Sequence, residues 1–539
     1  MDTNDVTRTA PDPGLTARIG GYLSGMGPSW VAGAIAAGPA TIASLVTAGA
    51  LFGYQLLWVV VLSAGAGALV QYLAMRLGLL TERGIVAVVE DHLGETWAWL
   101  LVADAVIAAG VAQLVIMKTV ATVSATVTGV DARIWGVVWA LVLAVGLAGR
   151  GYRFLEVVAK VLVAGVVVAF VASLFVVPID PGAAVAGLVP SVPVGGALVA
   201  AGILGGAVHI TLITMQSYTM RSRGWTREDY SLASFDIGAS MLVAFGIYSL
   251  AIFLVTASVL TSADLSTVGA AQALGPLVGP SAKWLFLLGL WGAAVSTLGG
   301  NTIVPPFLLA DKLGWGTTIE DTRYRGLLVA AALLSAPGAF IGGAVLGQLV
   351  LVLALGTVGT PFAIAIVLYL LNSDAVPDRN STLANVGGVA LLLVTGTLAA
   401  NFVREQVAGS GLAGLDPLSG FVLAFAVALA AAMVGLGGKF ALEEVALARD
   451  RRRPPVPARR HDPDRRPVER RQDAPDRPGA DGVAGTRGGR RGGRPRVRPR
   501  GGAGRSDSRG PSRPVRHAAR RRVAGRPRRP RTSGSSIFA

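Results

Sequence analysis

Long apolar segments recur along most of this chain and constrain its fold more than any other feature. Each is about 20 residues long, the length that an α-helix needs to cross the hydrocarbon of a bilayer. Because a helix satisfies its own backbone polar groups, repeated segments of this kind predict an all-α membrane protein. We place twelve of them near 29–51, 55–78, 98–120, 132–149, 154–178, 197–220, 235–259, 283–310, 325–343, 345–372, 383–403 and 417–437.

Basic residues are concentrated in every second connecting loop, that is, in the loops on one side of the membrane. The loops richer in them carry Arg76, Arg83, Arg150, Arg153, Arg221, Arg223, Arg227, Lys312, Arg323, Arg325 and Arg379. The opposite loops carry Arg133, Lys283 and Arg404 as single exceptions. This is the positive-inside bias, so we expect both termini to be cytoplasmic, in the plasma membrane of a prokaryote.

Two of the apolar segments are interrupted. Gly38 and Pro39 interrupt the first, and Gly205 and Gly206 interrupt the sixth. Gly and Pro disfavour a helix interior, and a broken helix persists in hydrocarbon only where it is buried or lines a wet cavity. A lone Gly-Pro would also fit a simple kink. Two breaks five segments apart instead favour two inverted five-helix repeats plus two extra helices, with the substrate bound where the breaks meet.

The two ends of the chain differ from this body. We expect a cytoplasmic N-terminal segment over 1–20, a transmembrane transporter domain over 21–440 and a disordered tail over 441–539. Residues 451–539 contain 28 Arg, no Lys and 7 acidic residues, or +21, whereas the whole chain carries +16. Basic clusters of this kind can bind anionic lipid head groups. Arg in an Ala/Gly/Pro/Asp background is also typical of a GC-rich gene read out of frame.

Several function classes are excluded by what the sequence lacks. The chain has no cysteine, so disulfides and thiolate metal sites are impossible. We find no Ser/His/Asp arrangement, no paired catalytic carboxylates and no phosphate-binding Gly loop followed by Lys. We therefore expect that the protein is not an enzyme and has no cofactor. We also expect no nucleic-acid partner for the folded body and no obligate protein partner.

Particular motifs resemble the Nramp divalent metal transporters. The most specific is the run from Ala48 to Trp58, preceded by Gly38-Pro39-Ala40-Thr41 and followed by Gln71 to Gly78. Supporting stretches occur in the same order at Gly151–Glu156, Ala233–Asp236 and Ala270–Gly279. The resemblance covers about residues 20–440 and implies a LeuT-like fold that carries divalent cations.

The resemblance also shows where this chain departs from the family. Typical members carry Asp-Pro-Gly-Asn at the first break, where this chain has Gly38, Pro39, Ala40 and Thr41. They carry Met-Pro-His at the second break, where it has His209-Ile210-Thr211. The usual formal negative charge and the soft thioether are therefore both missing, although a dication in a low dielectric needs charge or many oxygens.

The groups that remain define the expected substrate site. They are the backbone carbonyls of Ala37 and Gly38, the side chains of Thr41, His209 and Thr211, and in addition Gln216. Thr41 and His209 are the expected metal ligands. Neutral oxygens suit a partly hydrated ion such as Mg²⁺, whereas imidazole suits Mn, Fe, Co, Ni and Zn. A lone intramembrane His is also often a hydrogen-bonded structural residue.

Proton coupling of the usual family kind is not expected. The two helix 3 carboxylates of typical members align with Gly110 and Gln113. Intramembrane acids mark proton relays, and Asp104 and Lys160 remain in the bodies of the predicted spans 98–120 and 154–178. We expect these two to pair; a replacement proton path is the alternative. The alternatives to a divalent-cation carrier are a LeuT-like carrier of a small organic solute and a non-transporting sensor or scaffold.

Overall fold

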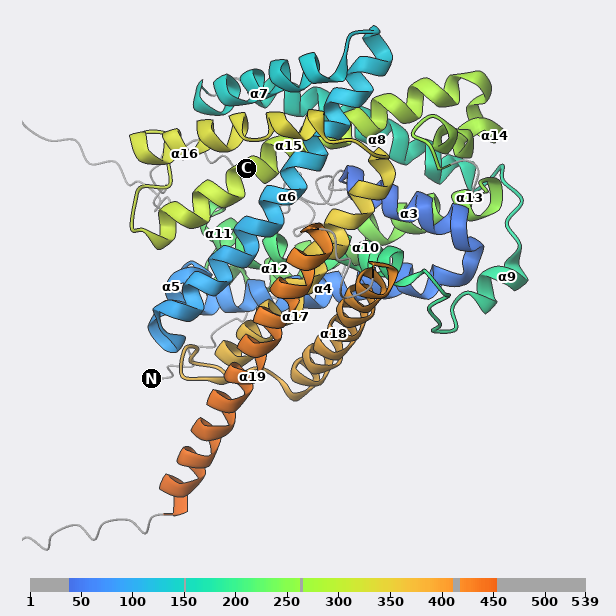
Figure 1. Cartoon of the computed structure of the whole chain (residues 1–539). Coiled ribbons are helices and arrows are strands. Elements are labelled where there is room, and N and C mark those ends of the chain that lie inside the picture. The colour runs from blue at the N-terminus through green and yellow to red at the C-terminus, as the bar shows by residue number, and fades with distance from the viewer. Residues whose placement is uncertain (1–37, 150–151, 262–264, 411–416, 453–539) are drawn as a thin grey trace, which may run out of the picture. The chain divides into compact units, whose positions relative to one another are not determined.

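The computed structural model describes residues 38–149, 152–261, 265–410 and 417–452, and every regular element in these ranges is helical (Figure 1). The chain divides into a unit of Met1–Ala448 with Ser536–Ala539 and a unit of Arg449–Ser535. The expectations for residues 1–20, for Ala37 and for the tail after residue 452 concern parts outside the described residues.

The helices follow one another as in Figure 1. They are α3 (Pro39–Phe52), α4 (Leu57–Thr81), α5 (Ile85–Leu93), α6 (Glu95–Thr128), α7 (Ala132–Gly149), α8 (Tyr152–Ser173), α9 (Pro181–Ala186), α10 (Ala197–Val208), α11 (Ile210–Ser222), α12 (Tyr230–Gly238), α13 (Gly246–Val259), α14 (Gly275–Val278), α15 (Ala282–Lys312), α16 (Thr322–Leu333), α17 (Val345–Asn372), α18 (Thr382–Ser410) and α19 (Pro417–Arg452). A π-helical stretch, Ala239–Phe245, joins α12 to α13.

Ten helical segments among the described residues are long and apolar enough to cross a membrane. One of them, Pro39–Thr81, contains the second predicted span and the described part of the first, because only a short 3₁₀ turn separates α3 from α4. The predicted all-helical membrane protein is therefore confirmed. The last helix, α19, extends beyond the predicted span and the predicted domain boundary at residue 440, to Arg452.

The helices differ in how deeply they are buried. The most apolar stretch of α17 is 83% buried and that of α10–α11 is 78% buried, whereas that of α19 is 17% buried. Large apolar side chains such as Val145 and Val434 are exposed on the outer helices, as expected for surfaces that face lipid. Helix α17 packs against α3, α6, α10 and α11, so the interrupted segment lies in the interior (Figure 1).

The predicted span at 325–343 is not one continuous helix of membrane-spanning length. Helix α16 has only 12 residues and ends at Leu333, and a 3₁₀ turn, Ala336–Phe340, follows it. Pro337 disfavours helical continuation because it removes a backbone donor and restricts the residue before it. Gly338 then packs directly on α6, where a β-carbon would overlap the carbonyl of Leu114. The interruption therefore lets this backbone approach α6 closely.

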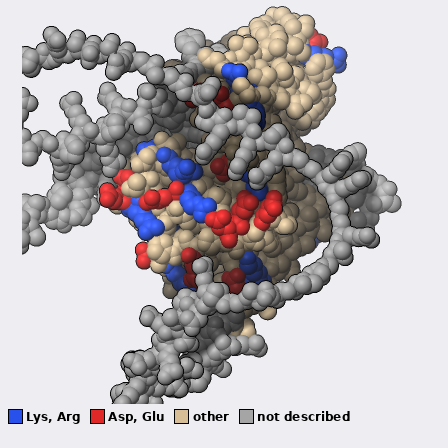
Figure 2. Space-filling model, turned by 90° about the vertical axis from the view of Figure 1, so that its left-hand side faces the viewer, with Lys and Arg blue, Asp and Glu red and all other residues tan. Residues whose placement is uncertain are grey.

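Charged side chains gather near the ends of helices. Figure 2 shows basic and acidic side chains grouped together on one face, beside surface that carries few charged residues. Arg83 pairs with Asp91 at 2.5 Å, and Lys312 lies 3.2 Å from Glu90. Lys312 also lies 3.6 Å from Glu95, so these contacts join the end of α15 to α5 and α6.

The close approach at Gly338 predicts a local stability difference. Gly338→Ala should destabilise the protein by about 1–3 kcal/mol, because the new methyl group overlaps a backbone carbonyl that cannot rotate away. Gly326→Ala in α16 is the matched control, since nothing lies within 4 Å of the place that its new methyl group would take. Thermal unfolding of the purified protein in detergent measures both. Equal melting temperatures for the two variants would contradict the packing described.

Candidate metal-binding site at the interrupted helices

The second break lies at His209. Helix α10 ends at Val208 and α11 begins at Ile210, while His209 has the extended backbone angles φ −53° and ψ 140°. The sequence places this break at Gly205 and Gly206, but both glycines lie inside α10. The predicted interruption of this segment is therefore present, three residues further along than predicted.

The two glycines serve close packing. A β-carbon on Gly205 would overlap the carbonyl of Leu353 in α17. A β-carbon on Gly206 would lie 2.8 Å from the hydroxyl of Thr41 in α3. Small residues allow helices to approach one another in this way within membranes. The contact also brings Thr41 beside the segment that ends at His209.

The imidazole of His209 caps the second half of the interrupted helix. Its Nδ1 accepts the backbone N–H of Thr211 at 3.3 Å and lies 2.9 Å from the Thr211 hydroxyl. In the neutral ring an accepting Nδ1 leaves the proton on Nε2. That Nε2 faces α17, where a β-carbon on Gly356 would overlap it. His209 is 7% exposed, so its ring is held between the break and α17.

The first break is described on one side only. Helix α3 begins at Pro39, with Gly38 in an extended conformation before it. The carbonyl of Gly38 already accepts the N–H of Ile42 at 3.2 Å, so only its second lone pair remains for a cation. The Thr41 side chain is buried, at 5% exposure. The expected contribution of the Ala37 carbonyl lies outside the described residues.

The remaining predicted ligand, Gln216, lies further along α11. It is six residues beyond Ile210, or about 9 Å along the axis, and it is half-buried. Among the described residues, no group of three or more His, Asp or Glu side chains could hold a metal ion. The structure thus places Thr211 against His209 at the break and Thr41 beside Gly206, one turn before it. The roles of these residues and of Gln216 as ligands stay predictions.

Helix α17 supplies groups that the sequence analysis missed. The hydroxyl of Thr360 donates at 2.9 Å to the carbonyl of Val208, the last residue of α10. The hydroxyl of Thr357 lies 3.0 Å from the carbonyl of Ala201. The last carbonyls of a helix lack intrahelical donors, so Thr360 stabilises the break. The sequence feature that could have revealed these groups is the run of small and polar residues Gly356–Pro361 inside an otherwise apolar segment.

Neutral side chains surround Gln113, one of the two residues that the sequence analysis aligns with the proton-path carboxylates of the family. Gln113 in α6 donates from Nε2 to the hydroxyl of Thr302 in α15. Asn301 donates to Oε1 of Gln113 at 3.0 Å and to the carbonyl of Ala109 at 2.7 Å. These amides and the hydroxyl satisfy one another without a charged group.

The expected pair between Asp104 and Lys160 does not form. Lys160 instead pairs with Glu156, one turn away on α8, at 2.7 Å. Asp104 is 1% exposed, and neither of its carboxylate oxygens has a hydrogen-bond partner among the described residues. The pairing failed because the sequence does not specify how each helix is rotated about its axis.

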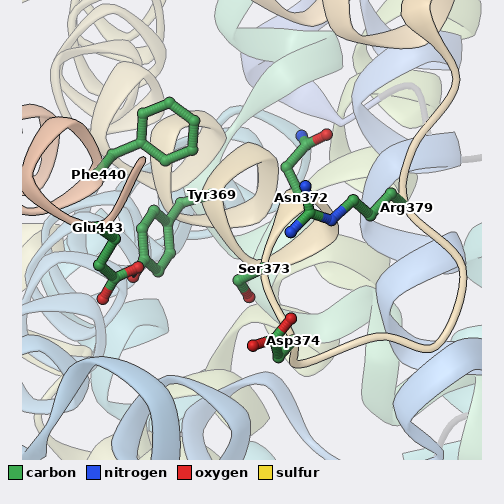
Figure 3. Close-up of a pocket in the computed structure, with 7 residues that line it drawn as sticks. All are labelled: Tyr369, Asn372, Ser373, Asp374, Arg379, Phe440 and Glu443. Carbon is green, nitrogen blue, oxygen red and sulfur yellow. Dashed lines mark hydrogen bonds between the residues drawn. The ribbon is translucent and has the colours of Figure 1, made fainter. Parts of the chain in front are cut away.

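A separate pocket lies at the far end of α17. Tyr369, Asn372, Ser373, Asp374, Arg379, Phe440 and Glu443 line it (Figure 3). Tyr369 donates to the carboxylate of Glu443, and the rings of Tyr369 and Phe440 meet edge to face at 5.9 Å. Tyr369 is 13 residues beyond Gly356, about 20 Å along the helix, so this pocket is distinct from the break.

Comparisons with known proteins agree on one family. The model of the family described as Nramp, natural resistance-associated macrophage protein-like, matches residues 29–405. The divalent metal cation transporter MntH of Mycobacterium tuberculosis is 28% identical over 409 residues, which cover 72% of this chain and 93% of the relative. Its counterpart in Klebsiella pneumoniae is 32% identical over 309 residues, covering 53% of this chain and 73% of the relative.

A solved structure shows the same fold. The manganese transporter of Eremococcus coleocola, crystallised with an aromatic bis-isothiourea substituted compound, superposes with a TM-score of 0.61. It is 17% identical, and the match covers 83% of this chain and 99% of that one. The predicted LeuT-like, all-helical fold class is confirmed.

The contact between Thr360 and the helix end predicts a cost for its removal. Thr360→Val keeps the side-chain shape but leaves the Val208 carbonyl without its donor, which should destabilise the protein by about 1–3 kcal/mol. Thr395→Val is the matched control, because that hydroxyl donates to the Leu391 carbonyl within its own helix. Thermal unfolding of both variants is the measurement. An equal loss in both would show that the contact across the break contributes nothing beyond an ordinary hydroxyl contact within a helix.

Proposed function

Because the chain belongs to the Nramp family, we propose that it moves divalent metal cations across the membrane by alternating access, as a secondary transporter or facilitator. The relatives named above are divalent metal and manganese transporters. The observation that supports this most is the interior break at His209, where the hydroxyl of Thr41 and the imidazole of His209 lie on neighbouring helices. Interrupted helices of this kind hold the substrate in transporters with inverted repeats.

The donor atoms define the kind of cation that suits this site. Nε2 of His209 favours ions such as Mn²⁺ or Fe²⁺. The neutral oxygens of Thr41, Thr211 and the backbone also suit a cation that keeps part of its water shell, such as Mg²⁺. For Nε2 to bind a metal, its proton must leave or move to Nδ1, and in the second case Nδ1 no longer accepts the Thr211 N–H. The site as proposed uses one nitrogen and several oxygens.

We further propose that transport proceeds without the usual proton coupling. The supporting observation is the network of Gln113, Asn301 and Thr302, which fills the aligned proton-path region with neutral groups. Intramembrane proton relays normally use acids or histidines. An organic-solute carrier finds less support, because the Thr211 N–H at the start of α11, which an anionic substrate would use, is already bound by His209.

We also propose that both termini of the chain lie in the cytoplasm. The absence of native cysteine allows single introduced cysteines to report it. Val130→Cys, after α6, should react with a membrane-impermeant maleimide added outside intact cells, and Glu228→Cys, before α12, should react only after permeabilisation. Both positions are exposed, so access to water is not the limiting factor. The reverse labelling pattern would invert the topology.

Metal binding at the break is tested by cation-dependent stabilisation. Mn²⁺ should raise the melting temperature of the full chain. His209→Ala and Thr41→Ala should each weaken the apparent affinity by about tenfold or more, which is about 1.4 kcal/mol or more. Thr126→Ala is the control, since that exposed hydroxyl bonds only within α6.

The outcomes separate the alternatives. Unchanged affinity in both His209→Ala and Thr41→Ala would place the metal elsewhere. A wild-type protein that is folded but stabilised by neither Mn²⁺ nor Mg²⁺ would contradict the metal assignment and favour an organic solute or a scaffold.

A further inference from the structure

Asp104 is a buried carboxylate without a partner among the described residues, in the interior of the transporter. Other acids of the described helices have partners: Asp236 pairs with Arg223, Asp311 accepts the hydroxyl of Tyr218, Glu156 pairs with Lys160, and Glu405 accepts the N–H of Ala197. Asp104 has neither a hydrogen bond nor an ion pair within the described residues and is 1% exposed. A buried charge is costly unless a positive charge approaches it.

The position of Asp104 is set by a glycine one turn from the one that faces His209. A β-carbon on Gly359 of α17 would overlap both carboxylate oxygens of Asp104. A β-carbon on Gly356 would overlap Nε2 of His209. β-Carbon positions three residues apart on a helix are about 5–6 Å from each other, so the carboxylate and Nε2 lie within about 10 Å of one another. Helix α6, which carries Asp104, also packs against α11.

We propose that Asp104 supplies the negative charge of the cation site at the His209 break. This inference rests on the proposed function and names a residue that determines affinity for divalent over monovalent cations. The break itself offers only neutral groups, while a dication in a low dielectric requires compensating charge. The glycine face formed by Gly356 and Gly359 leaves room for the imidazole and the carboxylate on the same side of α17.

The effect is electrostatic and therefore does not require Asp104 to be a direct ligand. At separations within about 10 Å in the protein interior, a carboxylate stabilises a dication twice as strongly as a monovalent cation. Removing the charge should thus reduce the affinity for Mn²⁺ or Mg²⁺ by about tenfold or more and reduce the preference over Na⁺. Replacing this carboxyl group, which has no hydrogen-bond partner among the described residues, should leave the metal-free protein about as stable as the wild type, because no native contact is lost.

The test compares Mn²⁺ titrations of the full-length protein, read out as thermal shift, for Asp104→Asn and Asp104→Glu. The neutral isostere should lose affinity about tenfold or more, while Asp104→Glu, which keeps the charge, should lose less. Gly359→Ala should also weaken Mn²⁺ binding, because its methyl group displaces the carboxylate. Gly347→Ala, at an open position of the same helix, is the control.

The possible outcomes are distinct. Loss of Mn²⁺ affinity in Asp104→Asn, with an unreduced metal-free melting temperature, supports the assignment. Wild-type affinity for Mn²⁺ in Asp104→Asn overturns it. A variant that changes only the pH dependence of binding also overturns it, because Asp104 would then bind and release protons instead of stabilising the metal. If the wild-type protein itself shows no response to Mn²⁺ or Mg²⁺, the proposed function fails instead, which is a distinguishable result.

Discussion

A helix that stops inside hydrocarbon leaves backbone groups that lipid cannot satisfy, and this constraint organises the interior of the protein. At the break, the ring of His209 accepts the Thr211 N–H of α11, and Thr360 donates to the Val208 carbonyl of α10. The first contact requires the imidazole ring to lie against the start of α11, and the second requires α17 to lie against the end of α10. Gly205 and Gly356 make that approach possible because they carry no side chain.

The same closeness governs the electrostatics of the interior. Ion pairs such as Lys312 with Glu90 lie near helix ends, and the network around Gln113 is neutral. Asp104 is the exception among the described residues, since it is buried without a partner. The described residues at the two breaks are neutral, whereas a dication in a low dielectric needs negative charge, and the fold holds one carboxylate within about 10 Å of His209.

The sequence was sufficient for the membrane class, for most spans and for the family, because length, hydropathy and the run from Ala48 to Trp58 are local signals. It was not sufficient for features that depend on packing. In the sequence, Gly205 and Gly206 are equally compatible with a helix break and with close helix packing. Only their contacts with α17 and α3 show that they serve packing. The partner of Asp104 depends on helix rotation, which hydropathy does not report.

The most direct test of this account is cation influx into proteoliposomes that contain the full-length protein and an internal fluorescent reporter. Influx of Mn²⁺ and of Mg²⁺ would be recorded at equal pH on both sides and again with an inward proton gradient. We predict saturable influx of at least one of these ions, at a rate that the gradient does not change and without acidification of the lumen. Influx that requires the gradient would contradict the proposed transport without proton coupling, and no influx by folded protein would contradict divalent-metal transport itself.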